Sequence, residues 1–287
     1  MLQSSCTYVQ YQIKSALALI LAAARDPSYF PLQSMSDPAR KAFSKVPEVT
    51  LIFWVIKIAA TTLGETGGDA VSMSMKLGYL VGTAIFAVLF IGAVIAQIRA
   101  VRFNAALYWT TIIATTMVGT TLADFADRSL GIGYAGGASL LFVALVASLG
   151  LWYWSLGSVS IGTVNSPKAE LFYWLTIMLS QTLGTALGDW TADTAGFGYT
   201  GAAVLFGSLL ALLVGAHLWT AISKTTLFWA AFILTRPLGA VLGDFLDKPI
   251  AAGGLALSRY TASITLLIFV AACILLVPQR GAKGSSH

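Results

Sequence analysis

The sequence predicts an all-α protein: a polytopic membrane bundle of eight transmembrane helices, made of four parallel two-helix repeats, with both termini in the cytoplasm. Composition is the first observation behind this prediction. Of 287 residues, 57% are hydrophobic and only 10% are charged, and the mean hydropathy is +0.80. A soluble domain carries about 25% charged residues, so the chain is expected to lie within a membrane. The second observation is a motif that occurs four times.

The motif begins with an aromatic–Trp pair. A glycine lies ten residues after each Trp, and an aspartate lies fifteen residues after it. Successive Trp positions are 55, 65 and 55 residues apart, so ten extra residues separate the second copy from the third. Self-similarity of this kind predicts a repeat architecture. The four copies contain Phe53-Trp54, Gly64 and Asp69; Tyr108-Trp109, Gly119 and Asp124; Tyr173-Trp174, Gly184 and Asp189; and Phe228-Trp229, Gly239 and Asp244.

The repeats predict the division of the chain. We expect an N-terminal extension over 1–45, repeats over 46–104, 105–167, 168–223 and 224–280, and an appended tail over 281–287. The apolar stretch 13–24 is shorter than the ~20 residues that a span needs. It is compatible with a signal peptide, an interfacial helix, a disordered segment or an upstream extension that precedes a start at Met35.

Each repeat contains two apolar runs of about bilayer length. A Gly-Tyr pair, replaced by Gly253-Gly254 in the last copy, is expected to start the second helix of each unit. Because two spans return the chain to the same side, all four units have the same orientation. The predicted spans are 49–68 with 77–98, 105–123 with 136–156, 171–188 with 201–222, and 226–243 with 257–277.

Lysine and arginine set the predicted orientation. Nine lie at the ends and in the loops between repeats, against four in the connections within repeats, namely Lys76, Arg128, Lys248 and Arg259. By the positive-inside rule the termini are cytoplasmic and the Asp-bearing turns face outside. The basic residues are too scattered for a nucleic-acid-binding face.

A polar stripe runs along the first helix of each repeat. Residues four apart share a helix face, and polar stripes are costly against lipid. Four stripes on four like-oriented helices are therefore expected to converge on a common interior. A glycine or alanine pair at small-xxx-small spacing lies beside each stripe and allows close packing. Counting back from each Asp, the stripes contain Lys57, Thr61 and Glu65; Thr116 and Thr120; Gln181 and Thr185; and Arg236 and Ala240.

The acids suggest a cation site. Asp69, Asp124, Asp189 and Asp244 are expected to form a ring that can bind an ion or a metal, with Glu65, Thr61, Thr120, Thr185 and Gln181 below it. Secondary acids follow at Asp127, Asp193 and Asp247, and Lys57 and Arg236 are expected counter-ions. Oxygen ligands suit a hard divalent cation, and the chain offers only two Cys and two His for a softer one.

Structural interpretations compete with this one. The repeated Asp residues could cap the helix that follows each turn. Lys57 with Glu65, or Arg236 with a neighbouring Asp, could form a structural ion pair. The Trp residues are expected to be interfacial anchors or packing groups rather than binding groups.

The pattern resembles a family of bacterial membrane proteins built from four tandem copies of a repeat of unknown function. Phe53-Trp54 with Thr-Leu-Gly-Glu-Thr (62–66), and Thr185-Ala-Leu-Gly-Asp-Trp ending at Trp190, carry the resemblance. It covers about residues 46–278 and implies a multi-pass protein of the bacterial inner membrane. It implies no activity, and the Gly253-Gly254 pair and the absence of a second acid in copy one depart from its pattern.

Three functions remain open from the sequence. The favoured one is a transporter for a cation, with a divalent metal as one version. The second is a carrier of a small organic or anionic solute that Lys57 and Arg236 recognise. The third is a membrane sensor or scaffold without transport.

No enzyme is expected, because no nucleophile–base set or phosphate loop is found, although an acid–base pair of Glu65 and Asp69 would suit one. No cofactor is expected. The expected partners are membrane lipid and a small cargo, with homo-oligomers left open.

Overall fold

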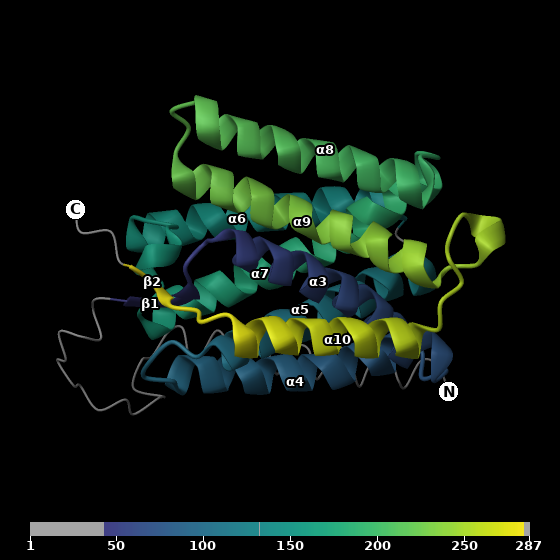
Figure 1. Ribbon diagram of the computed structural model, residues 1–287, viewed down its shortest axis with the longest axis horizontal. Helices are drawn as coiled ribbons and strands as arrows, with labels where there is room; N and C mark the ends of the chain where they lie inside the picture. Colours follow the sequence, from purple (N-terminus) through teal and green to yellow (C-terminus); the bar gives the residue numbers. More distant parts are fainter. Residues whose placement is uncertain (1–42, 132, 284–287) are drawn as a thin grey trace.

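The computed structural model describes residues 43–131 and 133–283, and within them the protein is a bundle of eight long helices (Figure 1). Two helices fall in each predicted repeat, close to the expected spans. The interpretations of the stretch 13–24 concern residues outside the described part. The helices are α3 (Leu51–Asp69), α4 (Tyr79–Arg99), α5 (Ala105–Asp124), α6 (Tyr134–Leu156), α7 (Pro167–Asp189), α8 (Gly198–Trp219), α9 (Lys224–Asp247) and α10 (Arg259–Leu276).

Five of these helices, α4, α6, α8, α9 and α10, are long and apolar enough to cross a membrane. The remaining three, α3, α5 and α7, carry polar stripes that lower their mean hydropathy. Most of their residues are buried against other helices. Several apolar helices around a more polar centre are typical of a membrane protein.

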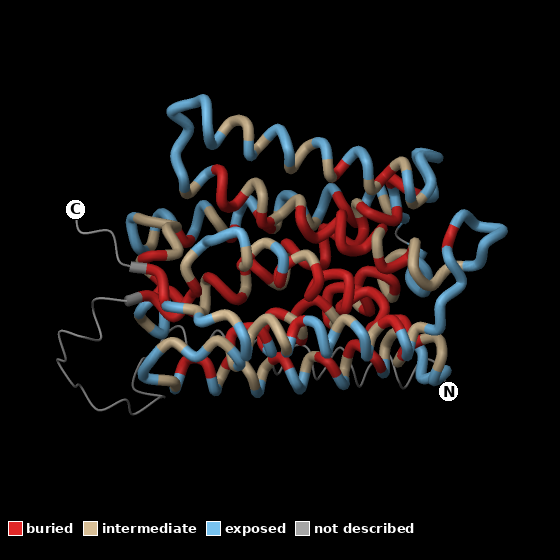
Figure 2. The backbone as a smooth tube through the Cα atoms, viewed as in Figure 1, coloured by how far each residue is buried: buried red, intermediate tan, exposed pale blue. Residues whose placement is uncertain are grey.

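The helices form two concentric sets. The inner helices α3, α5, α7 and α9 contact one another in a closed ring, since α3 packs on α5, α5 on α7, α7 on α9 and α9 on α3. Each outer helix packs on the inner helix of the next repeat: α4 on α5, α6 on α7, α8 on α9, and α10 back on α3. Buried residues therefore gather on the inner helices, while α8 and α10 expose much of their surface (Figure 2).

A π-helical turn follows the repeated Asp in the first three copies. These turns are η2 (Ala70–Ser74), η3 (Phe125–Ser129) and η5 (Trp190–Thr194). In the fourth copy α9 continues to Asp247, and a short 3-10 turn, η6 (Ile250–Ala252), comes later. Gly78 and Gly133, with φ of 80° and 79°, precede α4 and α6 and supply a backbone conformation that few other residues adopt. The Gly-Tyr pairs thus start outer helices, as expected.

The repeated Asp residues do not cap the following helices. Asp69, Asp124 and Asp189 are the last residues of their inner helices, and no side-chain cap bond is present at the start of α4, α6 or α8. The capping interpretation is therefore wrong for these three helices. The Asp side chains are directed to other partners, described below.

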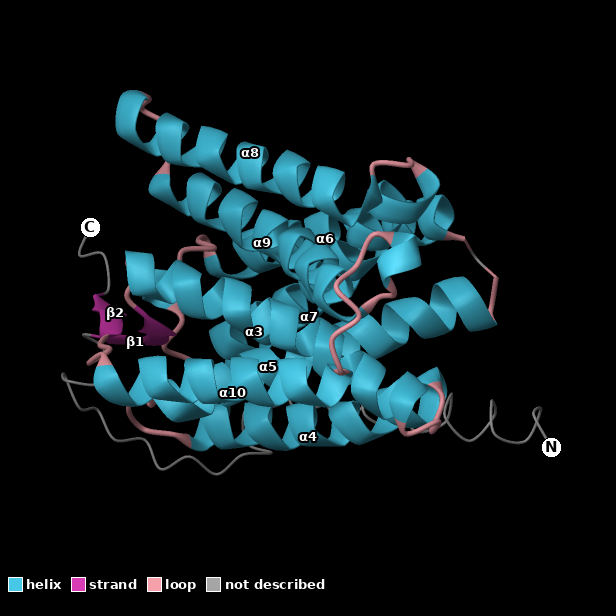
Figure 3. Cartoon of the chain, turned by 45° about the vertical axis from the view of Figure 1, so that its right-hand side comes forward, coloured by secondary structure: helices cyan, strands magenta, loops and turns pink. Residues whose placement is uncertain are grey.

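Two short strands add to the helical bundle, which the sequence did not predict. β1 (Phe43–Pro47) and β2 (Gly281–Lys283) pair as an antiparallel sheet and join the two ends of the described chain (Figure 3). The connection between repeats two and three, which contains the ten extra residues, packs against them, because the Ser44 hydroxyl donates to the Ile161 carbonyl at 2.6 Å. Lys45 is buried at the same end, where it pairs with Glu170 at 2.6 Å.

Candidate functional site

Repeat-equivalent residues of the inner helices form five buried layers, which we call the central column. Successive layers are four residues apart, so each helix presents the same face to the centre. All twenty side chains are buried, and the most exposed of them reaches only 6%. From one end to the other the layers are Phe53, Tyr108, Tyr173, Phe228; Lys57, Ile112, Ile177, Phe232; Thr61, Thr116, Gln181, Arg236; Glu65, Thr120, Thr185, Ala240; and the carboxylate layer Asp69, Asp124, Asp189, Asp244.

Glycines bring the stripes this close together. A Cβ atom added to Gly64 would collide with Thr116 of the next copy, and one on Gly119 would meet Gln181. The cycle continues with Gly184 against Arg236 and closes with Gly239 against Thr61 of the first copy. Each glycine therefore receives the polar stripe of the following repeat. The predicted small-residue packing is present, and its role is to draw four polar stripes into one interior.

Two basic residues bridge the carboxylate layer. Arg128 Nε lies 2.9 Å from Asp124, and its Nη2 lies 3.7 Å from Asp189. Lys248 Nζ lies 2.9 Å from Asp244 and 3.1 Å from Asp69. Each cation thus joins the Asp of its own repeat to the Asp of the next one. The layer is divided into two pairs, although the backbone around it has four similar units.

A third basic residue, Arg259, lies at the edge of the carboxylate layer. Arg259 Nε donates to Asp247 at 2.6 Å, and Arg259 Nη2 lies 3.6 Å from Asp69. Burial alone would lower the pKa of Lys248, but Asp244, Asp69 and Asp247 outweigh it and raise that pKa above its ordinary value. Lys248 therefore stays charged, and its stabilising contribution is lost only as the pH rises through this raised value.

Two turns deeper, Arg236 occupies the middle layer of the column, and its guanidinium reaches the Glu65 layer. Its Nη2 donates to Glu65 at 3.0 Å and also to the hydroxyls of Thr120 and Thr185. A single guanidinium of the fourth repeat thereby contacts a residue from each of the other three. Charge-assisted bonds of this kind are stronger than neutral ones.

Three carboxylates are close enough to share a cation. Ligand oxygens of Glu65, Asp189 and Asp244 all lie within 4.8 Å of one another, and the three side chains are buried. A second group of the same kind contains Asp69, Asp244 and Asp247. Carboxylate oxygens are the donors that Mg²⁺, Mn²⁺ and Ca²⁺ prefer. The residues present can therefore provide a hard-cation site at the carboxylate end of the column.

The remaining predicted residues have different places. Thr61 lines the column and donates to backbone carbonyls of its own helix, at 3.0 Å to Lys57 and 2.8 Å to Ile58. Among the secondary acids, Asp247 is paired, Asp127 is half-buried in η3, and Asp193 is exposed. The side chains of Lys57 and Gln181 lie in the column but make no hydrogen bond to another described residue.

Neither of the two predicted ion pairs is present among the described residues, because Arg236 pairs with Glu65 and not with a neighbouring Asp. Arg236 pairs with Glu65, whereas Lys57 does not pair with Glu65 in the described chain; its Nζ lies 4.1 Å from the centre of the Phe232 ring. The expected pair of Lys57 with Glu65 is therefore wrong. Glu65 is already bound by a guanidinium that reaches it from α9.

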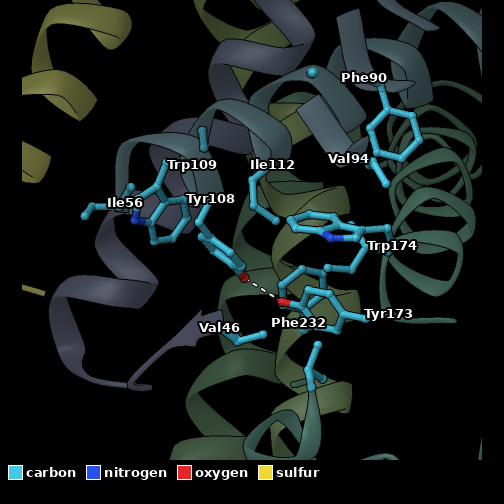
Figure 4. Close-up of a cluster of buried hydrophobic side chains, with 14 of the residues drawn as sticks. Val46, Ile56, Phe90, Val94, Tyr108, Trp109, Ile112, Tyr173, Trp174 and Phe232 are labelled. Carbon is cyan, nitrogen blue, oxygen red and sulfur yellow. Dashed lines mark hydrogen bonds between the residues drawn. The ribbon is translucent and has the colours of Figure 1, made fainter. Parts of the chain in front are cut away.

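Aromatic residues close the opposite end of the column. The hydroxyls of Tyr108 and Tyr173 meet at 2.6 Å (Figure 4), and the rings of Phe53 and Phe228 lie 6.1 Å apart. Each of these rings also contacts the Trp of the following repeat, in the pairs Phe53–Trp109, Tyr108–Trp174, Tyr173–Trp229 and Phe228–Trp54. The repeated Trp residues are packing groups that tie neighbouring repeats together.

A cavity of about 820 Å³ lies beside the column, between α3, α8 and α9. Apolar residues such as Trp54, Leu210 and Leu227 form most of its wall. It reaches Phe228 and Thr235 but includes no residue of the carboxylate layer. The column, with its buried charges, is therefore the candidate functional site.

Sequence reasoning assigned Arg128, Lys248 and Arg259 only to membrane orientation, and missed their contacts with the acids. A signal for two of them was present. Arg128 and Lys248 each lie four residues after a repeated Asp, which is the spacing of an ion pair along a helix. Arg259 follows Asp247 by twelve residues and approaches it only through the fold.

Four two-helix units with an apolar exterior and a polar centre define the class of this protein: a helical repeat protein of membrane type. It belongs to the family described as Repeat of Unknown Function (DUF347), whose pattern matches residues 52–103, 107–158, 172–223 and 227–278. Each matched segment lies within one predicted repeat, which confirms the resemblance. No curated protein and no solved structure matches the chain. The family description assigns no activity, so function has to be argued from the column.

Proposed function

We propose that this protein is a carrier for a cation, most simply a divalent metal ion, in the bacterial inner membrane. All eight helices would cross the bilayer, with cytoplasmic termini and the carboxylate layer near the outer face. Apolar side chains on outer helices support this placement, since Val88, Leu140 and Leu212 are 71%, 70% and 69% exposed. Such exposure is costly in water and favourable against lipid.

One observation carries the proposal: oxygens of Glu65, Asp189 and Asp244 lie within 4.8 Å of one another in a buried layer. Charged groups inside a membrane bundle are costly and typically mark an ion pathway. The three acids come from α3, α7 and α9, so a cation held by them would contact three of the four repeats. Movement of those helices would then alter the site, as a carrier requires.

The basic residues act as tethered counter-ions in this mechanism. Arg128, Lys248 and Arg236 neutralise the acids while no cargo is bound, which lowers the cost of keeping them within a bundle. An arriving cation competes with these side chains for the same oxygens. The aromatic layer blocks the other end, so Tyr108 and Tyr173 must separate before cargo passes it.

Flux into proteoliposomes tests the proposal. Purified protein is reconstituted into liposomes that enclose a fluorophore quenched by Mn²⁺. Entry of Mn²⁺, of Mg²⁺ and of protons is then measured in separate assays. Replacing a side chain that supports a metal site costs about 10–100-fold in affinity, so Asp189→Asn should lose at least that much at low Mn²⁺ concentration. Asp193→Asn is the matched control, because Asp193 is an exposed acid four residues further along.

Equal flux through Asp189→Asn and the wild type, with equal insertion, would overturn the proposal. No flux of any of these ions in the wild type would instead favour a sensor or scaffold. The two outcomes are separable, because the first retains transport and the second shows none.

A further inference from the structure

Below Glu65, the column contains three polar side chains with donor atoms that have no hydrogen-bond partner in the described part of the chain. The donor atoms Lys57 Nζ, Gln181 Nε2, and Arg236 Nε and Nη1 make no hydrogen bond to any described residue, and neither does the acceptor Gln181 Oε1. Each of the three side chains is fully buried. They come from α3, α7 and α9, and they lie outside the group of carboxylates that carries the cation proposal.

These donors lie in adjacent layers. Arg236 and Gln181 occupy equivalent positions in the fourth and third repeats. Lys57 belongs to the next layer, and its ammonium lies over Phe232, which precedes Arg236 by one turn of α9. Glu65 bonds to Arg236 only through Nη2, so the remaining guanidinium nitrogens are not engaged by it.

The charge balance of this region is positive. Among the described residues, one carboxylate, that of Glu65, bonds to Arg236, and none bonds to Lys57. A buried donor that lacks a partner destabilises the folded protein, and a charged one does so more strongly. Native proteins rarely leave such groups unpaired, and a bound ion is one of the recognised explanations. A bound anion would supply both acceptors and negative charge to these donors.

We propose that Lys57, Gln181 and Arg236 form a binding site for a small monovalent anion. Ile112, Ile177 and Phe232 share the Lys57 layer, so large or multiply charged anions would find apolar walls there. A halide or a short carboxylate meets these requirements. The anion would sit one to two helical turns from the cation site, and its binding goes beyond the proposed transport of a cation.

Direct titration of the purified protein in detergent tests the site. Sodium bromide and sodium acetate are titrated separately by calorimetry against a sodium gluconate background, which distinguishes a halide from a carboxylate ligand. Loss of a hydrogen bond to a charged group lowers affinity by roughly tenfold or more. Lys57→Met should therefore weaken binding of the preferred anion at least about tenfold. Gln181→Leu should weaken it as well.

Lys57→Met also has a stability readout that excludes misfolding. Methionine keeps the unbranched shape and removes a buried charge that has no paired acid, so the variant should melt at the same temperature as the wild type or higher. Lys168→Met, which changes an exposed lysine at the start of α7, is the matched control and should bind the anion normally. A stable Lys57→Met protein with unchanged anion affinity would overturn the proposal, as would a wild type that binds neither bromide nor acetate.

The anion site and the cation carrier can fail separately. A protein that binds bromide or acetate but carries no Mn²⁺, Mg²⁺ or protons retains the anion site and loses the cation proposal. A protein that transports a cation but binds neither anion retains the cation proposal and loses the anion site.

Discussion

Arg128 and Lys248 stand at equivalent positions in the second and fourth repeats. In the first and third repeats that position is occupied by Met73 and Asp193. Two basic side chains therefore pair with all four carboxylates, because each of the two bridges the Asp of its own repeat and the Asp of the following repeat. A difference of single residues converts a layer with four similar units into one with two ion-paired halves.

Replacement of one bridging cation should be costly. Lys248→Met leaves Asp69 and Asp244 buried without their shared partner, and breaking a buried pair on one side costs about 3–5 kcal/mol. We expect a loss of about 3 kcal/mol, because Lys248 retains 14% exposure. Chemical unfolding in detergent measures it. Lys168→Met should stay within about 0.5 kcal/mol, and a similar loss in both variants would contradict the role of the bridge.

The Tyr108–Tyr173 hydrogen bond offers a second test at this scale. Tyr108→Phe leaves the buried Tyr173 hydroxyl without its partner, which costs about 1–3 kcal/mol. The double variant, with Phe at both positions, reproduces the residue found in the first and fourth repeats and should lose less than the two single variants together. A double-mutant cycle of unfolding free energies checks this. Strict additivity would show that the hydroxyls do not interact.

At the scale of elements, each inner helix is held against its neighbour by a glycine that faces a polar side chain. A Cβ on Gly239 would collide with both the side chain and the backbone of Thr61. Backbone atoms cannot move aside as a side chain can. The contact therefore fixes the distance between α9 and α3 and keeps Arg236 in reach of Glu65.

Gly239→Ala should separate these two helices. Overpacking of a tight contact costs about 1–3 kcal/mol, and cation flux should fall because Glu65 and Asp244 move apart. Gly92→Ala is the control, since nothing lies within 4 Å of the added Cβ on α4. There the helix should gain about 0.5–1 kcal/mol. Thermal unfolding of both variants measures the difference, and an unharmed Gly239→Ala protein would contradict close packing at this seam.

The helices and their register were predictable because the repeat marks them directly. Spacing of Trp, Gly and Asp located the inner helices, and the four-residue stripe predicted which faces converge. The π-turns were not predictable, since no residue in 70–74 announces them. Arg259 was missed because its partner Asp247 is brought near by the loop between α9 and α10. The strands escaped prediction because each pairs with a segment more than 200 residues away.

For the whole molecule, the decisive feature is closure of the ring. α10 packs on α3 as each other outer helix packs on the next repeat, and β1 pairs with β2. The first and last repeats are therefore neighbours. Stability should depend on the complete circle rather than on the order in which the repeats are joined.

A circular permutant tests closure. Lys283 and Phe43 are paired across the two strands, so a short glycine–serine linker can join them, with new ends opened at the exposed turn between Thr220 and Ser223. The permuted chain, which lacks 1–42 and 284–287, should fold as a monomer in detergent. Its melting temperature should lie within a few degrees of an unpermuted chain of the same residues, as a circular dichroism melt would show. Failure of only the permutant would indicate that chain order matters.

The bridging cations also determine which seams of the ring are firm. Arg128 ties α5 to α7, and Lys248 ties α9 to α3. Between α3 and α5, and between α7 and α9, no salt bridge of the described chain crosses the carboxylate layer. At this end of the bundle, salt bridges therefore join repeat two to repeat three and repeat four to repeat one. The ten extra residues lie between repeats two and three, which Arg128 joins, so the break in the sequence and the two seams without a salt bridge lie a quarter of a turn apart.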